Sequence, residues 1–352
     1  MPDWTKPMKQ TFNYYIVDPV TWKNKEKIND VISSNIDRDG DAETLGSATF
    51  DINADLGECY IRAYLVTIQN GITEEHPLGT FLVQTPKMSF NGQYQKVSID
   101  AYTPLLELKE NPPPIGYTIM KNQKVMTYAY RLTREHVRAP VVELSTDDIL
   151  YSDFVANTSD SWLTYISDLL ATVKYKLGLD ELSRIIYMPD QDLTSLQPVW
   201  TYNDDNSSIL YPDISLDHDL YGIPNVVEVI YTSKLSNYYA RVVNDNPDSP
   251  TSTVNRGREI VKRITDPDFS GEPTKEMLEV YASEMLKQLS VVEYTVSYTH
   301  GYCPVRLGDC VRLNYTASGI KDVKAKVIRQ QIECSTGCKV TETAVYTANL
   351  WR

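Results

Sequence analysis

Apolar and polar residues alternate along several short segments of the first hundred positions. The alternation is clearest at Leu45–Ile52 and at Cys59–Gln69, and Asn70-Gly71 follows the second segment directly. A period of two buries one face of a strand, and Asn-Gly is a strong signal for a two-residue hairpin turn. Three further strands are predicted, at Phe12–Val17, Gly79–Thr85 and Tyr94–Tyr102, with a turn at Met88–Gly92 between the last two. Residues 1–105 are therefore expected to form a small β-domain, a barrel or a sandwich.

The pattern changes after residue 105. Pro112-Pro113-Pro114 marks a break that a strand cannot continue through. A helix is predicted over Ser161–Leu177, because its apolar residues recur at close to 3.6 positions. Short strands follow at Ser183–Met188 and Val199–Tyr202. Residues 106–220 are therefore expected to be a mixed α/β domain inserted after the first β-domain.

Strand patterns return in the last third of the chain and are interrupted once. Residues 246–289 form a helical excursion, with a short basic helix near Arg256–Ile264 and a longer helix over Thr274–Leu289. We expect this excursion to pack with the insertion domain. Residues 221–245 and 290–352 are predicted to form a second β-domain, with strands at Val226–Tyr231, Tyr238–Val243, Val291–Thr299, Cys310–Tyr315, Val323–Ile332 and Lys339–Tyr346. The predicted fold class is therefore α+β, mainly β, with two small β-barrel domains and an inserted mixed α/β domain.

Charge and composition limit the classes of partner. The net charge is −13, from 47 acidic and 34 basic residues, whereas a surface that binds phosphates should be basic. We expect no sequence-specific binding of nucleic acid, although an acidic wall suits a pore through which DNA slides. No run of 18 apolar residues exists, so no membrane span is expected, and the polar N-terminus is not a signal peptide. The 25 tyrosines against 6 phenylalanines fit strands and partly wet protein interfaces.

The motifs of common enzyme classes are missing from the sequence. It contains no P-loop, no Gly-X-Ser-X-Gly, no His-Glu-X-X-His and no Gly-X-Gly-X-X-Gly. The four histidines are far apart in the sequence. Asp217-His218-Asp219 invites a metal or acid–base interpretation, but a solvated turn is favoured because adjacent loop residues rarely converge on one point. We therefore predict that the chain is not an enzyme.

Four of the five cysteines lie near the end of the chain, with the spacings Cys303-X6-Cys310 and Cys334-X3-Cys338. In an antiparallel meander, both pairs would lie in connections at the same end of the domain, so four thiolates could converge. Four thiolates are the ligand set of structural zinc or of an iron–sulfur cluster. Free buried thiols and two local disulfides are the alternatives.

A basic run occupies the predicted short helix of the excursion: Arg256, Arg258, Lys262 and Arg263. A solvated helix face explains it most simply. The sharper interpretation is that these residues dock to an acidic neighbouring subunit.

Several strand segments resemble those of a known protein family. Pro77–Val83, Val97–Tyr102 and Thr103–Leu108 are similar to the end of the first barrel in baseplate hub and tail-tip proteins of long-tailed phages and prophages. The family has Asp where this chain has Thr103. Other segments share the resemblance, namely Gly46–Ile52, Tyr60–Leu65 and, for the second barrel, Val292–Tyr298 and Arg306–Tyr315.

The resemblance implies an architecture and a function. Such hubs carry two similar β-barrels, here 1–105 and 221–245 with 290–352, separated by a mixed domain. It implies a homotrimer in the virion tail, assembled in the host cytoplasm, that adapts the six-fold tail tube or distal tail ring to the three-fold spike protein. Its channel would pass the tape-measure protein and DNA. The alternative is a tail-associated cell-wall hydrolase of a peptidase-like kind, but we expect no lytic domain after Arg352.

The resemblance also bears on the cysteines. Some related tail-tip proteins hold an iron–sulfur cluster on four C-terminal cysteines, and Cys303, Cys310, Cys334 and Cys338 have a similar order and spacing. This favours a 4Fe-4S cluster over zinc at these positions. The resemblance implies no catalytic residue.

Overall fold

The computed structural model describes residues 2–53, 56–90, 95–205, 209–233, 236–267, 269 and 273–351. The fold is mainly β with few helices, as predicted. The chain divides into two compact units. The first unit comprises residues 1–214 and 297–344, and the second comprises 215–296 and 345–352.

Seven strands precede residue 103 in the described part of the chain; five of them overlap the predicted strands, whereas β2 and β3 were not predicted. The predicted hairpin at Asn70-Gly71 is confirmed: both residues have positive φ, 54° and 80°, as a type I′ turn requires. Gln69 and Ile72 pair across it. The strands are β1 (Lys9–Val17), β2 (Asn24–Ile28), β3 (Val31–Asp39), β4 (Gly46–Ile52), β5 (Tyr60–Gln69), β6 (Ile72–Phe90) and β7 (Gln95–Tyr102). The predicted turn at 88–92 lies partly outside the described residues.

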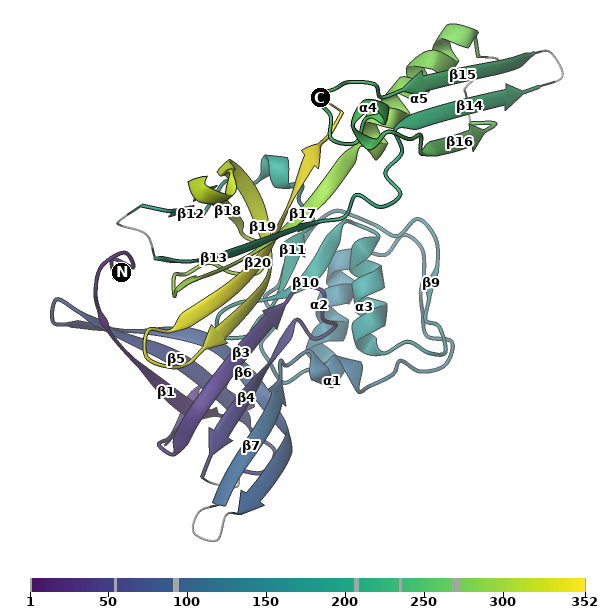
Figure 1. Cartoon of the computed structure of the whole chain (residues 1–352). Helices are drawn as coiled ribbons and strands as arrows, with labels where there is room; N and C mark the ends of the chain where they lie inside the picture. The colour runs from purple at the N-terminus through teal and green to yellow at the C-terminus, as the bar shows by residue number, and fades with distance from the viewer. Residues whose placement is uncertain are drawn as a thin grey trace. The chain divides into compact units, whose positions relative to one another are not determined.

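Strands from the two ends of the sequence join in one 13-stranded sheet (Figure 1). Its order is β13-β17-β20-β19-β3-β4-β7-β6-β5-β1-β2. Strand β18 branches from β19, and β12 pairs with β18. The link is the antiparallel pair β19–β3, in which Ile36 lies opposite Ile332. Within the described residues the pairing does not close into a barrel, so the division into two barrels stays a prediction.

The C-terminal strands match their predicted positions closely. They are β17 (Val291–Gly301), β18 (Cys310–Tyr315), β19 (Ile320–Glu333) and β20 (Lys339–Asn349), with a 3₁₀ turn at Thr316–Ser318. The predicted meander order is not observed, because β20 lies between β17 and β19. Strand β12 (Trp200–Asn203) pairs with β18 in parallel, and β13 (Leu210–His218) pairs with β17.

The mixed α/β region of the first unit has one core of its own. Its helices are α1 (Leu106–Lys109), α2 (Val125–His136) and α3 (Trp162–Ala171), and their apolar faces share that core with Tyr187. Two short strand pairs complete it, namely β8 (Thr118–Ile119) with β9 (Phe154–Val155) and β10 (Tyr175–Leu179) with β11 (Ile185–Pro189). A further 3₁₀ turn spans Leu193–Ser195.

The helix predicted over Ser161–Leu177 is shorter than expected. Ser161 caps its start, accepting a hydrogen bond from the Thr164 N–H at 3.2 Å, but the helix ends at Ala171. Lys174 has φ of 59°, a left-handed conformation that ends helices. Leu177 then lies in β10, where it stays apolar and buried.

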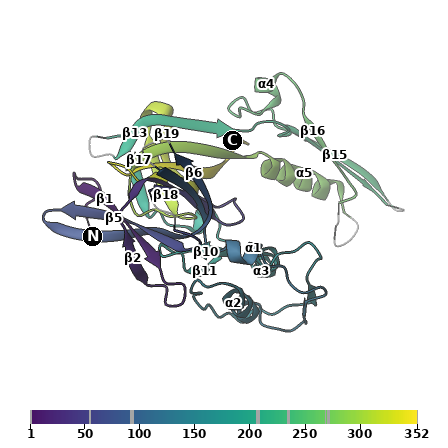
Figure 2. The same cartoon turned by 90° about the horizontal axis from the view of Figure 1, so that it is seen from below.

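The second unit contains a three-stranded sheet with a helix against one face. Strand β14 (Val226–Thr232) pairs with β15 (Asn237–Val243) antiparallel and with β16 (Val261–Thr265) in parallel. Helix α5 (Lys275–Leu289) packs on this sheet (Figure 1, Figure 2). Their shared core is Val227, Val229, Ala240, Leu278, Ala282 and Leu286. This packing groups 226–243 with the excursion, whereas the sequence pattern assigned the two to different domains.

The excursion confirms one predicted helix and corrects the other. The predicted helix Thr274–Leu289 is α5, with Thr274 as its N-cap. The basic helix predicted near Arg256–Ile264 is wrong. A four-residue helix, α4 (Thr253–Arg256), ends at Gly257 with φ of 62°, and the chain continues as β16 because β14 offers a free edge there.

No helix in the described part of the chain is long and apolar enough to cross a membrane.

Candidate functional site

Polar side chains occupy buried positions on two neighbouring strands of the first unit. On β17, Tyr298 and His300 lie on the same inward face as Val296, since alternate residues of a strand face the same way. On β20, Glu342 lies between the buried Val340 and Ala344. Because β17 and β20 are adjacent, the alternation brings a histidine, a tyrosine and a carboxylate together inside the sheet.

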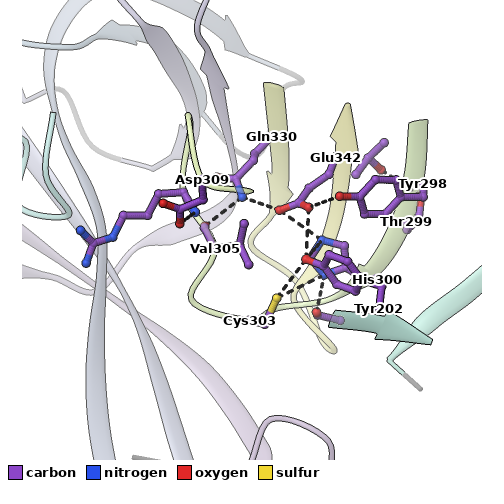
Figure 3. A network of polar contacts seen from close by, with 12 residues as sticks. Tyr202, Tyr298, Thr299, His300, Cys303, Val305, Asp309, Gln330 and Glu342 are labelled. Atoms are coloured by element: carbon purple, nitrogen blue, oxygen red, sulfur yellow. Dashed lines mark hydrogen bonds and ion pairs between the residues drawn. The ribbon is translucent and has the colours of Figure 1, made fainter. Parts of the chain in front are cut away.

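Glu342 is the centre of a hydrogen-bonded network (Figure 3). Its Oε2 accepts from the Tyr298 hydroxyl at 2.8 Å and from the Tyr202 hydroxyl at 3.1 Å. Its Oε1 accepts from Gln330 Nε2 at 2.5 Å and lies 3.4 Å from His300 Nε2. Four side chains from β12, β17 and β19 therefore converge on one carboxylate of β20.

The network continues to the connection between β17 and β18. Gln330 Nε2 also donates to the Val305 carbonyl at 2.9 Å, and the Tyr202 oxygen lies 3.1 Å from the Cys303 sulfur. Arg38 of β3 donates to Gln330 Oε1 at 3.1 Å. The network thus ties the 302–309 connection and β3 to the C-terminal strands.

The histidine and the carboxylate form a buried ion pair. Burial alone lowers the pKa of His300, but the Glu342 carboxylate outweighs it and raises that pKa to about 10. Burial raises the pKa of Glu342, while His300 and the hydrogen bonds from Gln330 and Tyr298 lower it below its ordinary value overall. Burial and the Glu342 charge together raise the pKa of Tyr298 and of Tyr202. At neutral pH the pair is imidazolium and carboxylate, and both phenols keep their protons.

These residue types could support acid–base chemistry, but their placement does not. His300 and Glu342 are both 0% exposed, and Tyr202, Tyr298, Gln330 and Cys303 are all buried. Both carboxylate oxygens already accept hydrogen bonds. A general base must reach its substrate, so the geometry supports a structural role that fixes four strands and a loop in one arrangement.

The four predicted cysteine ligands are all buried, and none forms a disulfide. The two connections that carry them lie side by side as predicted, since the Tyr302 N–H donates to the Cys338 carbonyl at 3.0 Å. Burial raises the pKa of Tyr302 to about 12, and Cys338, Cys303 and Cys334 contribute to that rise. Three thiols therefore lie near one tyrosine, while the Cys310 sulfur lies 3.9 Å from the Val311 carbonyl.

The thiols do not form a metal-ligand set in this conformation. Among the described residues, no group of three or more His, Cys, Asp or Glu side chains is arranged to hold a metal ion. Burial raises the pKa of Cys334 to about 11 and raises that of Cys310 and Cys338, which keeps these thiols protonated. The zinc or iron–sulfur site therefore stays a prediction, without geometric support here.

Asp217-His218-Asp219 brings no ligand set together either. His218 ends β13 and stacks on Tyr294 of β17, with ring centroids 4.9 Å apart. Asp219 accepts a hydrogen bond from the Tyr221 N–H at 2.7 Å. The residues behave as the exposed strand end and turn that the sequence favoured.

The basic run splits into two kinds of residue. Arg256 donates to the carbonyls of Leu220 and Ile223, each at 3.0 Å. Arg263 binds Glu228 at 2.7 Å. Arg258 and Lys262 are exposed. Within the described part of the chain, no hydrogen bond or ion pair engages the side chains of Arg258 and Lys262, so these two are the ones available to a partner.

Sequence reasoning missed the Glu342 network. Tyr202, His300 and Glu342 are far apart in the sequence, and no motif joins them. One feature of the sequence could have indicated it: Tyr298, His300 and Glu342 are polar residues at the inward positions of strands whose other inward residues are apolar.

No protein-family model matches the sequence, and no curated protein does. Solved structures do match along nearly the whole chain. A tail protein from Neisseria meningitidis MC58 has a TM-score of 0.60 at 13% identity, over 96% of this chain and 97% of that chain. The 43 kDa tail protein of prophage MuSo2 from Shewanella oneidensis has a TM-score of 0.56 at 10% identity, over 95% and 98% of the two chains. The chain therefore has the fold of these two tail proteins, and the resemblance to phage tail proteins that its strand motifs indicated is confirmed at the level of the fold.

Proposed function

We propose that the chain is a structural hub protein of a phage or prophage tail. The observation that carries this proposal is the extent of the fold match, which covers 96% of this chain and 97% of the Neisseria tail protein. A match of that extent includes both units and the strands that join them. It supports a shared architectural role more than a shared binding site, because fold alone does not specify chemistry.

In the proposed arrangement three copies form a ring at the baseplate or tail tip. The ring adapts a six-fold tail tube or distal tail ring to a three-fold spike, with the N-terminal and C-terminal strands acting as two similar barrels. The net charge of −13 supports a channel wall that DNA and the tape-measure protein pass without binding, since like charges repel phosphates. The protein would be assembled in the host cytoplasm and remain in the virion tail.

A structural role is supported over an enzymatic one by the buried network. The one group of acid–base side chains described above is closed to solvent, with Glu342 accepting hydrogen bonds on both oxygens. Peptidoglycan hydrolysis by the purified chain, measured as dye release from labelled cell walls, should equal the buffer background. Hydrolysis that survives further purification would favour the cell-wall hydrolase instead.

The direct test is the location of the protein in particles. Particles purified from a host that carries the gene are labelled with a gold-conjugated antibody against the chain and quantified by mass spectrometry. We expect gold at the distal end of the tail and three copies per particle. Absence from purified particles, with the protein free in the lysate, would overturn the proposal.

The cysteine metal site is a separate proposal with its own test. Native mass spectrometry of protein purified without oxygen distinguishes the apo chain from a chain with zinc or a 4Fe-4S cluster. Cys303, Cys310, Cys334 and Cys338 would be the ligands. A bound mass that is lost when Cys310 is replaced by Ser would support the four-thiolate site, and an apo chain would leave four structural thiols.

A further inference from the structure

The first unit exposes a group of large apolar side chains around the β8–β9 pair. Tyr151 is 95% exposed and Ile115 is 94% exposed. Met120, Ile149 and Val155 are also exposed. These residues lie on two adjacent backbone segments, 115–123 and 149–155. Thr118 pairs with Val155, and the Leu150 N–H donates a hydrogen bond to the Gln123 carbonyl. A group of this kind is typical of a protein interface, whereas single exposed apolar residues are ordinary.

The segment just before this group has free backbone and acidic side chains. Residues 142–148 belong to no helix or strand. Within the described residues, Glu143–Asp147 form no backbone–backbone hydrogen bond. Glu143, Asp147 and Asp148 are exposed, and Asp147 has one ion pair, to Lys124 at 3.0 Å. We name residues 142–155 the acidic segment.

The second unit carries a surface of opposite character. Strand β16 is an edge of its sheet, paired with β14 on one side. Lys262 of this strand and Arg258 just before it are exposed, and Val261 is 44% exposed. The carboxylate between them, Glu259, pairs with Arg241 at 2.7 Å. We name residues 258–263 the basic edge. Edge strands with free backbone groups pair readily with other chains.

We propose that the acidic segment of one copy of this chain binds the basic edge of the next copy. The inference rests on the proposed ring and assigns the surfaces that build it. Acidic side chains at 143, 147 and 148 face Arg258 and Lys262 of the neighbour, and Tyr151 and Val155 cover Val261. The free backbone of the segment adds to the edge of β16, which is a recurrent mode of recognition.

The two surfaces differ from each other, so the contact is heterologous. Repeated head-to-tail contacts close into a ring or grow into a filament, whereas a self-complementary patch stops at a dimer. This geometry suits a hub with three identical copies. Opposite charge chiefly sets orientation and partner choice, and the apolar contact adds affinity.

Charge reversal tests the contact on the full chain. The variants are Arg258→Glu/Lys262→Glu, Glu143→Lys/Asp148→Lys and a combined variant with all four changes. Self-association is measured by sedimentation velocity over a range of concentrations. We expect either double variant to weaken association by about ten-fold or more, and the combined variant to recover most of it because the charges are exchanged.

The matched control reverses two lysines on another edge strand. Lys25→Glu/Lys27→Glu lies on β2, at the far end of the large sheet, where both residues are exposed. It changes the net charge by the same amount as Arg258→Glu/Lys262→Glu and should leave association within about two-fold. Tyr151→Ser/Val155→Ser tests the apolar part and should weaken association at high salt as well. Circular dichroism checks that each variant is folded, and Arg258→Ala/Lys262→Ala replaces any that is not.

Two results would overturn the contact. The first is a wild-type chain that stays monomeric at the highest concentration. The second is association that the control weakens as much as the double variants, or that the combined variant does not recover. Failure of this contact is distinguishable from failure of the proposed function. An associating chain that ignores both reversals loses only this interface, whereas absence from virions refutes the tail assignment whatever the association shows.

Discussion

Two of the charged sites buried in the first unit are compensated in different ways. His300 and Glu342 compensate each other's charge, and Tyr202, Tyr298 and Gln330 complete their hydrogen bonds. Arg62, in contrast, is 3% exposed, and its described partners are neutral. Burial of an ion is costly unless charge or hydrogen bonds replace its water. One site uses both forms of compensation and the other relies mainly on hydrogen bonds.

The partners of Arg62 come from the sheet. Its Nε donates to the Thr80 hydroxyl at 2.7 Å, and its Nη1 donates to the Trp22 carbonyl at 3.1 Å and to Asn24 Oδ1 at 3.2 Å. Its Nη2 has no hydrogen-bond partner among the described residues. The guanidinium also lies 5.7 Å from the centroid of the Trp22 ring. The charge of Arg62 is therefore stabilised by neutral hydrogen-bond acceptors and by the face of the Trp22 ring.

The location of each site explains the difference. The Glu342 network lies within strands that are already paired, so it reinforces one sheet. The Arg62 site joins the sheet to the β10–β11 turn, since Thr80 donates to the Leu182 carbonyl at 2.9 Å and Ser183 Oγ accepts from the Thr80 N–H at 2.7 Å. Ser183 has φ of 56°, an uncommon conformation for a residue other than glycine. The fully compensated charges, those of His300 and Glu342, thus lie in the sheet interior. The partly compensated charge of Arg62 lies at a junction between two parts of one unit.

The largest effect should come from Glu342→Leu. It removes the carboxylate, so His300 loses the charge that compensates it and the hydroxyls of Tyr298 and Tyr202 lose their carboxylate acceptor. Breaking one side of a buried pair costs about 3–5 kcal/mol, and we expect the free energy of unfolding in urea to fall by that amount. Glu333→Leu, at an exposed position on β19, is the control and should cost less than about 1 kcal/mol.

The comparison breaks if Glu342→Leu matches its control. That outcome would mean that the network contributes packing and no charge compensation. The double variant His300→Phe/Glu342→Leu separates the contribution of packing from that of charge compensation, because it removes both charges together. It should recover much of the loss, as apolar replacements of buried ion pairs often do.

The pH dependence of stability tests the same pair without losing its side chains. The pKa of His300 is raised from 6.5 to about 10 in the folded chain. Between pH 6.5 and 8 the folded state therefore holds a proton that the unfolded state has released. Stability from this group is complete below pH 6.5 and is lost as pH rises towards 10, with a slope of roughly 1 kcal/mol per pH unit at most.

Urea unfolding at pH 6.5, 7.2 and 8 measures this slope. His300→Gln lacks the titrating group, so its unfolding free energy should be flatter over the same interval. The buried thiols begin to titrate in the unfolded state near the upper end of this interval, but both chains contain them, so the difference between the two slopes isolates His300. Equal slopes in the wild type and the variant would show that folding does not shift the pKa of His300, and a wild-type stability that rises with pH would show that His300 is neutral in the folded chain.

Local pattern predicted most strands because one face of each is buried. The Asn70-Gly71 turn and strand Cys310–Tyr315 were predicted at the positions where they occur. Helix α2 was missed, although its buried residues Val125, Ala129 and Leu132 recur at helical spacing and Arg131 and Arg134 lie on its exposed face. Periodicity failed where tertiary contacts decided the state, as in Leu177 leaving a helical pattern for β10.

The candidate site was less predictable than the fold. The sequence placed both cysteine-bearing connections together, and the Tyr302–Cys338 hydrogen bond bears that out. It could not predict that β20 lies between β17 and β19, which is what brings Glu342 to His300. Strand order depends on pairings between distant segments, and single-strand patterns carry no information about it.

Arg62→Met should have a smaller effect than Glu342→Leu. It removes three hydrogen bonds and the contact with the Trp22 ring, but it also removes a buried charge that has no carboxylate among its described partners. We expect a net cost of about 1–3 kcal/mol, measured by urea unfolding. Arg62→Lys, which keeps the charge and loses the fork of donors, should cost at least as much. A cost equal to or above that of Glu342→Leu would mean that Arg62 is compensated at least as fully as the His300–Glu342 pair.

The smallest effect should come from Thr80→Val, which tests the junction alone. The change keeps the side-chain volume and removes the hydroxyl that bridges Arg62 and Leu182. The Leu182 carbonyl stays satisfied, because the Trp22 indole N–H also donates to it at 3.0 Å, so the cost should be about 0.5–1.5 kcal/mol. Thr80→Ser restores the hydroxyl and should recover most of that loss except for one methyl group.

Amide hydrogen exchange in the β10–β11 turn gives the more specific readout. Faster exchange there in Thr80→Val, with unchanged exchange in β17 and β20, is the result expected of a junction that opens independently of the sheet interior. Equal acceleration in both places would instead unite the two buried sites in one cooperative unit.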